Sequence, residues 1–386
     1  FVKQTCWTPP LYFFTIMLKI IAKVVDFMRK HYIDNIRIGT VLLVVLYHVI
    51  YMFNHIITAG VIGPVTSVHG QDVIQYLLYP WFMVILFIIS GMSAKYYLEH
   101  HSDKEFIRAR TRKLLVPSTI GLFVIGWLQG YFNMAISGAF SNIPDSVPGF
   151  VLYPIMVVSG VGVLWTLQVL WVVSLVLVLL RKIEKGRLLK IGAKANMVVL
   201  LLLGIVVWGA AQILNTPVIC VYRFGIYGCA FLLGYYVFSE EAVTDRLKKY
   251  CIPLSAIAVA LGIAYTYIYY GENYAEAPVV NCPLAIAYAW LMCLAIIGCM
   301  KRWGDKSNAF TAFCNKKSFG LYVFHYLALS ATAYELTQHT ALPGWSFYLI
   351  GLVAAYAGGL LCYEIIVRIP IVRWCVLGVK KEKKNV

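Results

Sequence analysis

The chain has 386 residues, of which 61% are hydrophobic and 13% are charged, whereas soluble proteins average about 45–50% apolar and about 25% charged residues. This composition excludes a soluble globular domain, and with ten cysteines and no periodic glycine or proline it also excludes disordered, collagen-like and disulfide-rich proteins. The net charge of +16 would ordinarily favour a nucleic-acid partner, but the placement of the positive residues follows a membrane topology, and no nucleic acid is expected.

Ten apolar runs are long enough to cross a lipid bilayer as helices, since a spanning helix needs about 20 largely apolar residues. They lie near 38–58, 74–97, 114–134, 160–180, 197–214, 217–238, 252–270, 283–300, 319–335 and 345–366. The expected fold class is therefore an all-α integral membrane protein with about ten transmembrane helices. A further apolar run at 11–30 carries its charges along one stripe, so we expect an amphipathic helix in the inner leaflet.

The positive residues predict which side of the membrane each connection faces. All Lys and Arg residues except Arg223 fall in every second connection between the spans. The connections in between contain no Lys or Arg, and they lie near 59–73, 135–159, 215–216, 271–282 and 336–344. Positive residues beside short loops mark the cytoplasmic side, so both termini are expected there. The predicted divisions are a cytoplasmic segment at 1–36, a transmembrane domain at 37–367 and a basic cytoplasmic tail at 368–386.

Arg37 and His48 are the first candidate functional residues, because ionisable groups are costly in lipid and usually face a cavity. Arg37 opens the first span and His48 follows eleven residues later. The helical rise puts the imidazole ~16 Å along the axis, near the middle of a ~30 Å hydrocarbon layer. An imidazole at this depth can take a proton from a hydroxyl. A core histidine bonded to a neighbouring helix would give the same pattern.

A basic cluster follows the second span, just before Pro117, and consists of Arg108, Arg110, Arg112 and Lys113. Guanidinium and ammonium groups at a membrane surface can bind the phosphates of a nucleotide-like donor. The same cluster could equally be an anchor of the cytoplasmic side.

Other polar residues within the spans have a functional and a structural interpretation. Arg223 lies about six residues into the sixth span from its outer end, where a structural partner or an anionic or sugar ligand would both explain it. His325 is a candidate ligand or hydrogen-bond donor in the ninth span. Ser90 and Gly91 form a small pair that lets a helix or a ligand approach closely. The remaining histidines fall in loops or near span ends, and no metal site is expected.

In this order and on these spans, the residues resemble the membrane acyltransferase 3 family. The segment YIDNIRIGTVLLVVLYH is similar to the family's arginine, ten residues, histidine motif, and FIISG to the Ser-Gly ending of the second span. Arg110, Lys113 and Pro117 match a basic-x-x-basic-x-x-x-Pro loop, with Lys113 where an arginine is usual. LWTLQVLW, which contains Trp165, resembles a stretch of the fourth span, and SFGLYVFH, which contains Tyr322, resembles one of the ninth. YEIIVRIPIVRW is similar to the closing segment of the glucan-modifying succinyltransferases, the glucans biosynthesis protein C subgroup.

The resemblance implies a cytoplasmic acyl-CoA donor, with acetyl or succinyl as the acyl group, and a hydroxyl acceptor on an extracytoplasmic glycan or glycolipid. It implies a multi-pass protein of the bacterial cytoplasmic membrane. The expected site residues are His48 and Arg37 for catalysis, Arg110, Lys113, Arg108, Arg112 and His325 for the donor, and Arg223, Ser90, Trp165 and Tyr322 for the substrate. A transporter or flippase for a glycan or anionic molecule stays open, because ten helices with a buried Arg and His would serve it too.

Overall fold

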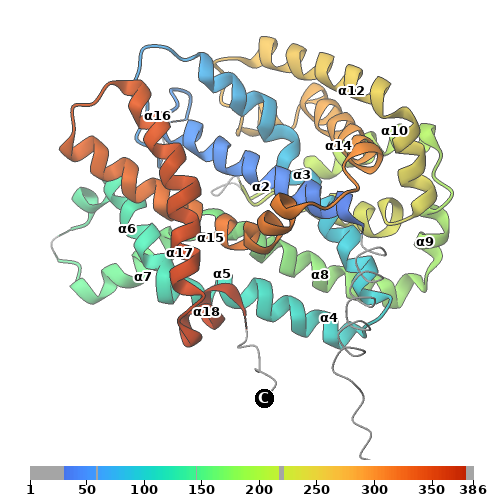
Figure 1. The fold of residues 1–386 in the computed structure, drawn as a ribbon, viewed down its shortest axis with the longest axis horizontal. Helices are drawn as coiled ribbons and strands as arrows, with labels where there is room; N and C mark the ends of the chain where they lie inside the picture. Colours follow the sequence, from blue (N-terminus) through green and yellow to red (C-terminus); the bar gives the residue numbers. More distant parts are fainter. Residues whose placement is uncertain (1–29, 58–59, 145, 217–220, 380–386) are drawn as a thin grey trace, which may run out of the picture.

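A computed structural model gives the structure of the chain and describes residues 30–57, 60–144, 146–216 and 221–379. These residues are almost entirely helical (Figure 1), and in place of strands they contain a single isolated β-bridge between Asn215 and Arg223. The all-helical fold class is therefore confirmed. The amphipathic helix expected at 11–30 lies, except for its last residue, outside the described residues.

Seven helical segments of the described chain are long and apolar enough to cross a membrane. They are His31–Met52 (α2), Gly70–Leu98 (η1 and α3), Asp103–Ile136 (α4 to α6), Gly162–Glu184 (η5 and α8), Glu241–Tyr269 (α12), Pro283–Trp303 (α14) and Gly344–Ile366 (α16 and α17). Each coincides with a predicted span. A multi-pass membrane protein is thus confirmed, while the number of ten spans stays a prediction.

The three other predicted spans correspond to helices outside this group. The span predicted at 197–214 corresponds to a shorter apolar helix, α10 (Met197–Ala211). The span predicted at 217–238 corresponds to the apolar helix Phe224–Phe238, which consists of α11 (Phe224–Leu233) and the π-helical turn η6 (Gly234–Phe238). The span at 319–335 lies inside α15 (Ala309–His339), which has 31 residues but is not one of the seven, and Lys316 and Lys317 lie just before its apolar run.

One apolar helix lies in a segment expected to be an outer loop. This helix, α7 (Gly149–Ser159), has 11 residues, too few to cross ~30 Å of hydrocarbon, and for that reason hydropathy did not predict it as a span. It packs against α6 (Trp127–Ile136) through backbone: a Cβ on Gly130 would lie 1.7 Å from the Met156 carbonyl oxygen. The segment 135–159 is therefore partly a helix packed on the bundle.

The remaining helices complete the bundle, and several long ones consist of shorter pieces. The bounds are α4 (Asp103–Arg110), η2 (Thr111–Leu115), α5 (Val116–Ser118), η3 (Leu122–Gly126), η4 (Ala139–Asn142), α9 (Arg187–Gly192), α13 (Ala277–Val280), α16 (Gly344–Val353), η7 (Ala354–Gly358), α17 (Gly359–Ile366) and α18 (Pro370–Leu377). Four of the pieces, η2, η3, η6 and η7, are π-helical turns, which are typical of places where a helix is bent or carries a functional site.

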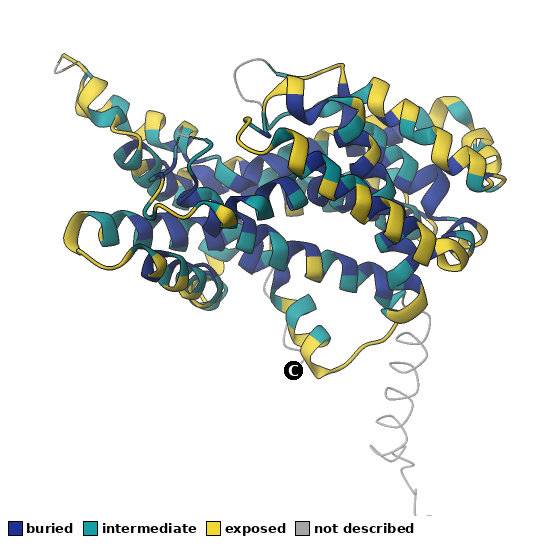
Figure 2. Ribbon diagram, turned by 90° about the horizontal axis from the view of Figure 1, so that it is seen from above, coloured by how far each residue is buried: buried dark blue, intermediate teal, exposed yellow. Residues whose placement is uncertain are grey.

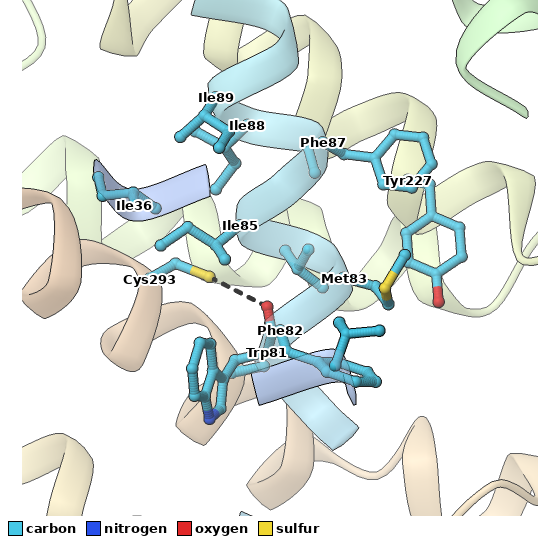
Figure 3. Close-up of a cluster of buried hydrophobic side chains, with 14 of the residues drawn as sticks. Ile36, Trp81, Phe82, Met83, Ile85, Phe87, Ile88, Ile89, Tyr227 and Cys293 are labelled. Carbon is cyan, nitrogen blue, oxygen red and sulfur yellow. Dashed lines mark hydrogen bonds between the residues drawn. The ribbon is translucent and has the colours of Figure 1, made fainter. Parts of the chain in front are cut away.

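The centre of the bundle is α3 (Val73–Leu98), which packs against α2, α11 and α14 (Figure 1). Figure 3 shows its side chains pointing outward to these neighbours, with Phe87 stacked on Tyr227 at 4.6 Å between ring centroids and the Cys293 thiol beside the Trp81 carbonyl. The helices approach closely because glycines lie at the contacts: a Cβ on Gly91 would lie 2.0 Å from the Phe231 carbonyl oxygen.

The exposed surface of the outer helices is apolar, as expected for helices that face lipid. Exposed large hydrophobic residues include Leu202 and Ile205 on α10 and Ile257 and Ile263 on α12. Figure 2 shows the exposed residues on the outer helices and loops and the buried residues in the middle of the bundle. The polar network described below is therefore enclosed by apolar helices.

The connections rich in Lys and Arg meet at one end of the bundle. Glu241 pairs with both Lys30 and Lys301, and Arg181 pairs with Asp103. At the other end, connections without Lys or Arg contact one another, as where the Tyr270 hydroxyl donates to the His69 carbonyl. The alternating charges along the sequence therefore separate in space. The compartment that each end faces stays a prediction.

Candidate functional site

Two histidines from distant parts of the sequence meet inside the bundle. His48 lies on α2 and His325 on α15, and Nε2 of His325 is 3.2 Å from Nδ1 of His48, with 5.0 Å between the ring centroids. The His325 side chain is fully buried, whereas His48 is half-buried. A glycine explains the close packing around them, because a Cβ on Gly359 of α17 would lie 3.0 Å from the His325 Cα.

The hydrogen bonds of the pair define which ring nitrogen carries a proton. Nδ1 of His325 lies 3.1 Å and 2.9 Å from the carbonyl oxygens of Leu321 and Tyr322, so it must be the donor and its Nε2 the acceptor. Nδ1 of His48 lies 2.8 Å from the Val44 carbonyl oxygen and faces the His325 acceptor, so it too carries the proton. Consequently the lone pair of neutral His48 is on Nε2, the nitrogen that is available to a ligand.

Tyrosines surround the exposed side of the pair. The Tyr326 ring lies 5.0 Å from the His48 ring and the Tyr47 ring 5.1 Å from it. The Tyr47 hydroxyl also contacts the Tyr274 hydroxyl at 3.1 Å, which links the site to the connection after α12. These aromatic side chains hold the imidazole in a surrounding that is apolar except for a few hydroxyl groups.

A cavity of about 490 Å³ lies beside the histidine pair, toward the end of the bundle where the basic connections meet. Five of the predicted site residues line this cavity, and they come from four helical regions: Arg37 of α2, Ser90 of α3, Arg110 and Lys113 in or beside η2, and Tyr322 of α15. Neither histidine is among its lining residues. Tyr322, one helical turn before His325, connects the cavity to the pair.

The cavity carries an excess of positive charge. Its lining contains Arg37, Arg110, Lys113 and Lys316 and no carboxylate. The positive charge of Arg37 is compensated by the Asp34 carboxylate, whose Oδ1 lies 2.7 Å from a terminal nitrogen of Arg37. The guanidinium also donates to the Ser93 hydroxyl at 3.1 Å. Among the described residues, neither Lys113 nor Lys316 forms an ion pair. A cavity lined by uncompensated cations is suited to an anion such as a phosphate.

Arg110 and Ser90 contact each other at the wall of the cavity. A terminal nitrogen of Arg110 donates to the Ser90 carbonyl oxygen at 3.4 Å, and the guanidinium lies 5.1 Å from the centre of the Phe106 ring. The Ser90 hydroxyl donates to the Leu86 carbonyl at 2.7 Å, within its own helix. No base lies within hydrogen-bond distance of that hydroxyl in the described chain, so Ser90 is suited to lining the cavity.

Tyr322 holds the start of α8 (Trp165–Glu184) against α15, and Trp165 packs that start against α11. The Tyr322 hydroxyl donates to the Val163 carbonyl at 2.8 Å and also contacts the Thr166 hydroxyl. Trp165 is nine-tenths buried, and its ring lies 5.3 Å from that of Tyr227. Thr166 and Tyr322 both line the cavity, whereas Trp165 lies behind it.

Three other predicted site residues lie away from the cavity. Arg108 is exposed on α4, and Arg112 is half-buried with its Nε lacking a partner. Arg223, only 4% exposed, donates to the Asn281 side-chain oxygen at 2.6 Å and lies 6.0 Å from the Tyr227 ring. Its surroundings are those of a buried structural arginine, and a role with substrate stays a prediction.

Sequence reasoning assigned no role to two residues of the cavity region. Lys316 lies nine residues before His325, and it was counted only as part of a basic connection. Asp34 lies three residues before Arg37, a spacing at which helical side chains meet, and this spacing was the signal that could have identified the pair.

Comparison with known proteins gives one match. The model of the acyltransferase 3 family, described as an acyltransferase domain, matches residues 30–364, which include both histidines and every residue of the cavity except Leu377 and Val379. No curated protein and no solved structure matches the chain. The match indicates a membrane acyltransferase and, in the absence of a named relative, does not extend to a subgroup.

Proposed function

Because the chain belongs to the acyltransferase 3 family, we propose that it is an O-acyltransferase that uses cytoplasmic acyl-CoA. The acceptor is a hydroxyl of an extracytoplasmic glycan or glycolipid. The observation that carries the proposal is the histidine pair beside a positively charged cavity. It provides a proton acceptor and an anion site close to each other in the bundle.

The cavity is the donor site of this proposal. Coenzyme A carries phosphate groups, and Arg110, Lys113 and Lys316 provide charge-assisted hydrogen-bond donors without competing carboxylates. Arg37 also lines the cavity and orients the donor there, while Asp34 and Ser93 fix its guanidinium. The pantetheine arm then extends past Ser90 and Tyr322 and brings the thioester toward the histidines.

The chemical step uses His48 as general base. Nε2 of His48 removes the proton of the acceptor hydroxyl as its oxygen attacks the thioester carbonyl carbon. The carbon–sulfur bond then breaks, the ester is released, and the thiolate of coenzyme A takes the proton from the imidazolium. His325 accepts the Nδ1 proton of His48 in a hydrogen bond throughout, so it holds the ring and stabilises its positive charge. A positioned general base typically contributes 10²–10⁴-fold in rate.

The proposal is tested with purified protein, a panel of acyl-CoA thioesters and a glycan acceptor. The parent should transfer an acyl group, and His48→Ala should lower turnover about 100-fold or more, since the base is lost while the donor site is intact. His339→Ala is the matched control, because His339 is an exposed histidine paired with Glu335 at the far end of α15, about 21 Å along the helix from His325. Equal turnover in His48→Ala and the parent would contradict the mechanism.

The resemblance of the closing segment to the glucan-modifying subgroup allows succinyl, besides acetyl, as the acyl group. A succinyl donor brings a carboxylate into the membrane, where an unpaired charge is costly, and Arg223 is the cation proposed to meet it. Arg223→Gln should then lose turnover with succinyl-CoA selectively. Equal losses with succinyl-CoA and acetyl-CoA would assign Arg223, with its bond to Asn281, to the fold or the acceptor.

A further inference from the structure

Three metal-ligating side chains meet in the connection between α2 and α3, apart from the cavity. His55 follows the end of α2, His69 precedes the short helix η1 (Gly70–Asp72), and Asp72 ends it. Their ligand atoms all lie within 4.8 Å of one another. We call these three residues the outer triad. His55 and His69 are separated by a connection without a regular pattern, so the sequence does not show that their side chains meet.

Asp72 is the residue of the outer triad that most needs a partner. Its side chain is fully buried. One carboxylate oxygen, Oδ2, contacts Nδ1 of His55, and it also accepts a long hydrogen bond of 3.4 Å from the backbone N–H of the same residue. The other oxygen, Oδ1, is buried with no hydrogen-bond partner. A buried carboxylate oxygen without a partner is costly, so the structure favours an additional positive group at this position.

The two imidazoles of the outer triad lie face to face. Their rings stack with 4.0 Å between centroids and 28° between planes. If the rings rotate so that their in-plane lone pairs point to one place, one cation beside the carboxylate would compensate its charge and bind both histidines.

We propose that the outer triad binds a divalent transition-metal cation, for which Zn²⁺ is the best match. Two imidazole nitrogens and one carboxylate oxygen are a ligand set of open zinc sites, in which water takes the fourth position. Zinc bonds of about 2.0–2.2 Å put tetrahedral ligand atoms roughly 3.5 Å apart. The three ligand atoms lie within 4.8 Å of one another, so side-chain rotations would bring them to that separation. Two nitrogen ligands disfavour Ca²⁺ and Mg²⁺, which prefer oxygen.

The backbone around the outer triad is already held in place, so little order has to be created on binding. The Asn54 side-chain oxygen accepts the N–H groups of Ile56 and Ile57 at 2.8 Å and 2.6 Å, which fixes the turn that carries His55. On the other side, the Tyr270 hydroxyl donates to the His69 carbonyl at 2.8 Å. A metal at the outer triad would therefore clamp the end of α2 to the start of α3 and to the residue after α12.

This clamp goes beyond the proposed acyl transfer. His55 follows His48 by seven residues, so the metal would lie beyond the outer end of α2, on the side from which the acceptor is expected to arrive. The bound cation would hold the connection between α2 and α3 in a single conformation at that entrance. Its binding does not depend on whether the protein transfers acyl groups.

The proposal is tested on the full chain in lipid nanodiscs, without a histidine tag and after treatment with a chelator. Titration with ZnCl₂ against a chromophoric competitor should give one equivalent bound at micromolar or lower concentration, and Co²⁺ in place of Zn²⁺ should give the intense visible absorption of a tetrahedral site. His69→Ala and Asp72→Asn should each weaken Zn²⁺ binding roughly 100-fold or more, since changing even a residue that only supports a ligand costs 10–100-fold.

Two controls keep the result decisive. His339→Ala removes an exposed histidine outside the outer triad and should bind Zn²⁺ as the parent does. If the parent binds no stoichiometric Zn²⁺, the outer triad is a histidine–aspartate ion pair and the proposal is wrong. If the parent binds one equivalent and both triad variants bind it equally well, the metal lies elsewhere and the assignment is likewise overturned. Neither outcome depends on acyl-transfer activity.

Discussion

At the residue scale, the reaction depends on which nitrogen of each histidine carries a proton. The carbonyl oxygens of Leu321 and Tyr322 determine the tautomer of His325, and His325 in turn helps to determine that of His48. A single histidine in a membrane helix could present either nitrogen to the substrate. The second histidine therefore acts as a positioning residue that keeps the basic nitrogen of His48 directed at the acceptor.

We expect His325→Ala to lower kcat about tenfold or more, while His325→Gln retains much of it. The amide oxygen of Gln can still accept the Nδ1 proton of His48, and a hydrogen bond to a group that becomes charged contributes about 1.5–3 kcal/mol. The measurement is kcat and KM for acyl-CoA in the parent and both variants. A role in packing alone would lower thermal stability without lowering kcat.

Donor binding is tested by removing two cations from the cavity. Arg110→Gln combined with Lys113→Gln should weaken coenzyme A binding roughly tenfold or more, because two charge-assisted contacts are lost. Arg108→Gln is the matched control, since Arg108 is an exposed cation that lies near Arg110 in the sequence and is not part of the cavity lining. Calorimetric titration with coenzyme A measures the effect. If the double variant binds like the control, the basic cluster is only an anchor of one membrane side.

At the element scale, the bundle depends on close approach between helix backbones. Gly91 of α3 and Gly234 of η6 each face a backbone carbonyl of the opposite helix, and a Cβ at either position would lie 2.0 Å from the carbonyl oxygen. These glycines let α3 lie directly against α11 and η6. Ser90, next to Gly91, then faces the cavity from the neighbouring side of α3.

Gly91→Ala should therefore destabilise the protein by several kcal/mol, because the new methyl group would overlap the Phe231 carbonyl and force the helices apart. Gly39→Ala on α2 is the matched control. No atom lies within 4 Å of a Cβ at that exposed position, and alanine there should be neutral or stabilise the helix by up to about 1 kcal/mol. Thermal unfolding in detergent compares them. A Gly91→Ala melting temperature equal to that of the control would contradict the packing.

Hydropathy predicted the long helices well and the interrupted ones less well. Seven predicted spans coincide with long apolar helices because a continuous run of apolar residues has few other structures in lipid. The short helix α7 and the π-helical turns such as η2 were not predicted, since they depend on neighbouring helices that supply partners for the backbone. α15 shows the same limit, because this one helix continues beyond both ends of the predicted span and includes Lys316 and Lys317 before it.

The candidate site was predictable to a similar extent. The family motif drew attention to Arg37, His48, Ser90 and Arg110, and the structure gathers three of these four around one cavity with His48 close by. The contact between His48 and His325 was not predictable, because spacing within one helix says nothing about its rotation relative to another. The outer triad was missed for the same reason, since its members come from a connection without periodicity.

At the scale of the whole molecule, the proposed reaction requires the two ends of the bundle to face different compartments. The cavity lies toward the end where the basic connections meet, and the outer triad lies toward the other, with His48 between them along α2. A donor entering from one end and an acceptor from the other would meet at the histidine pair. The orientation of the bundle therefore decides which substrates can reach the site.

Cysteine labelling in intact cells tests this orientation. Ser307 and Asn142 are exposed at opposite predicted sides, Ser307 in the basic connection before α15 and Asn142 at the end of η4. An impermeant maleimide should label Asn142→Cys in intact cells and Ser307→Cys only after the membrane is opened, because positive connections stay in the cytoplasm. The parent is the control for the native cysteines, and none of those in the described chain is exposed. The opposite labelling pattern would put the positive cavity outside the cell, where cytoplasmic acyl-CoA could not reach it, and would overturn the proposed donor.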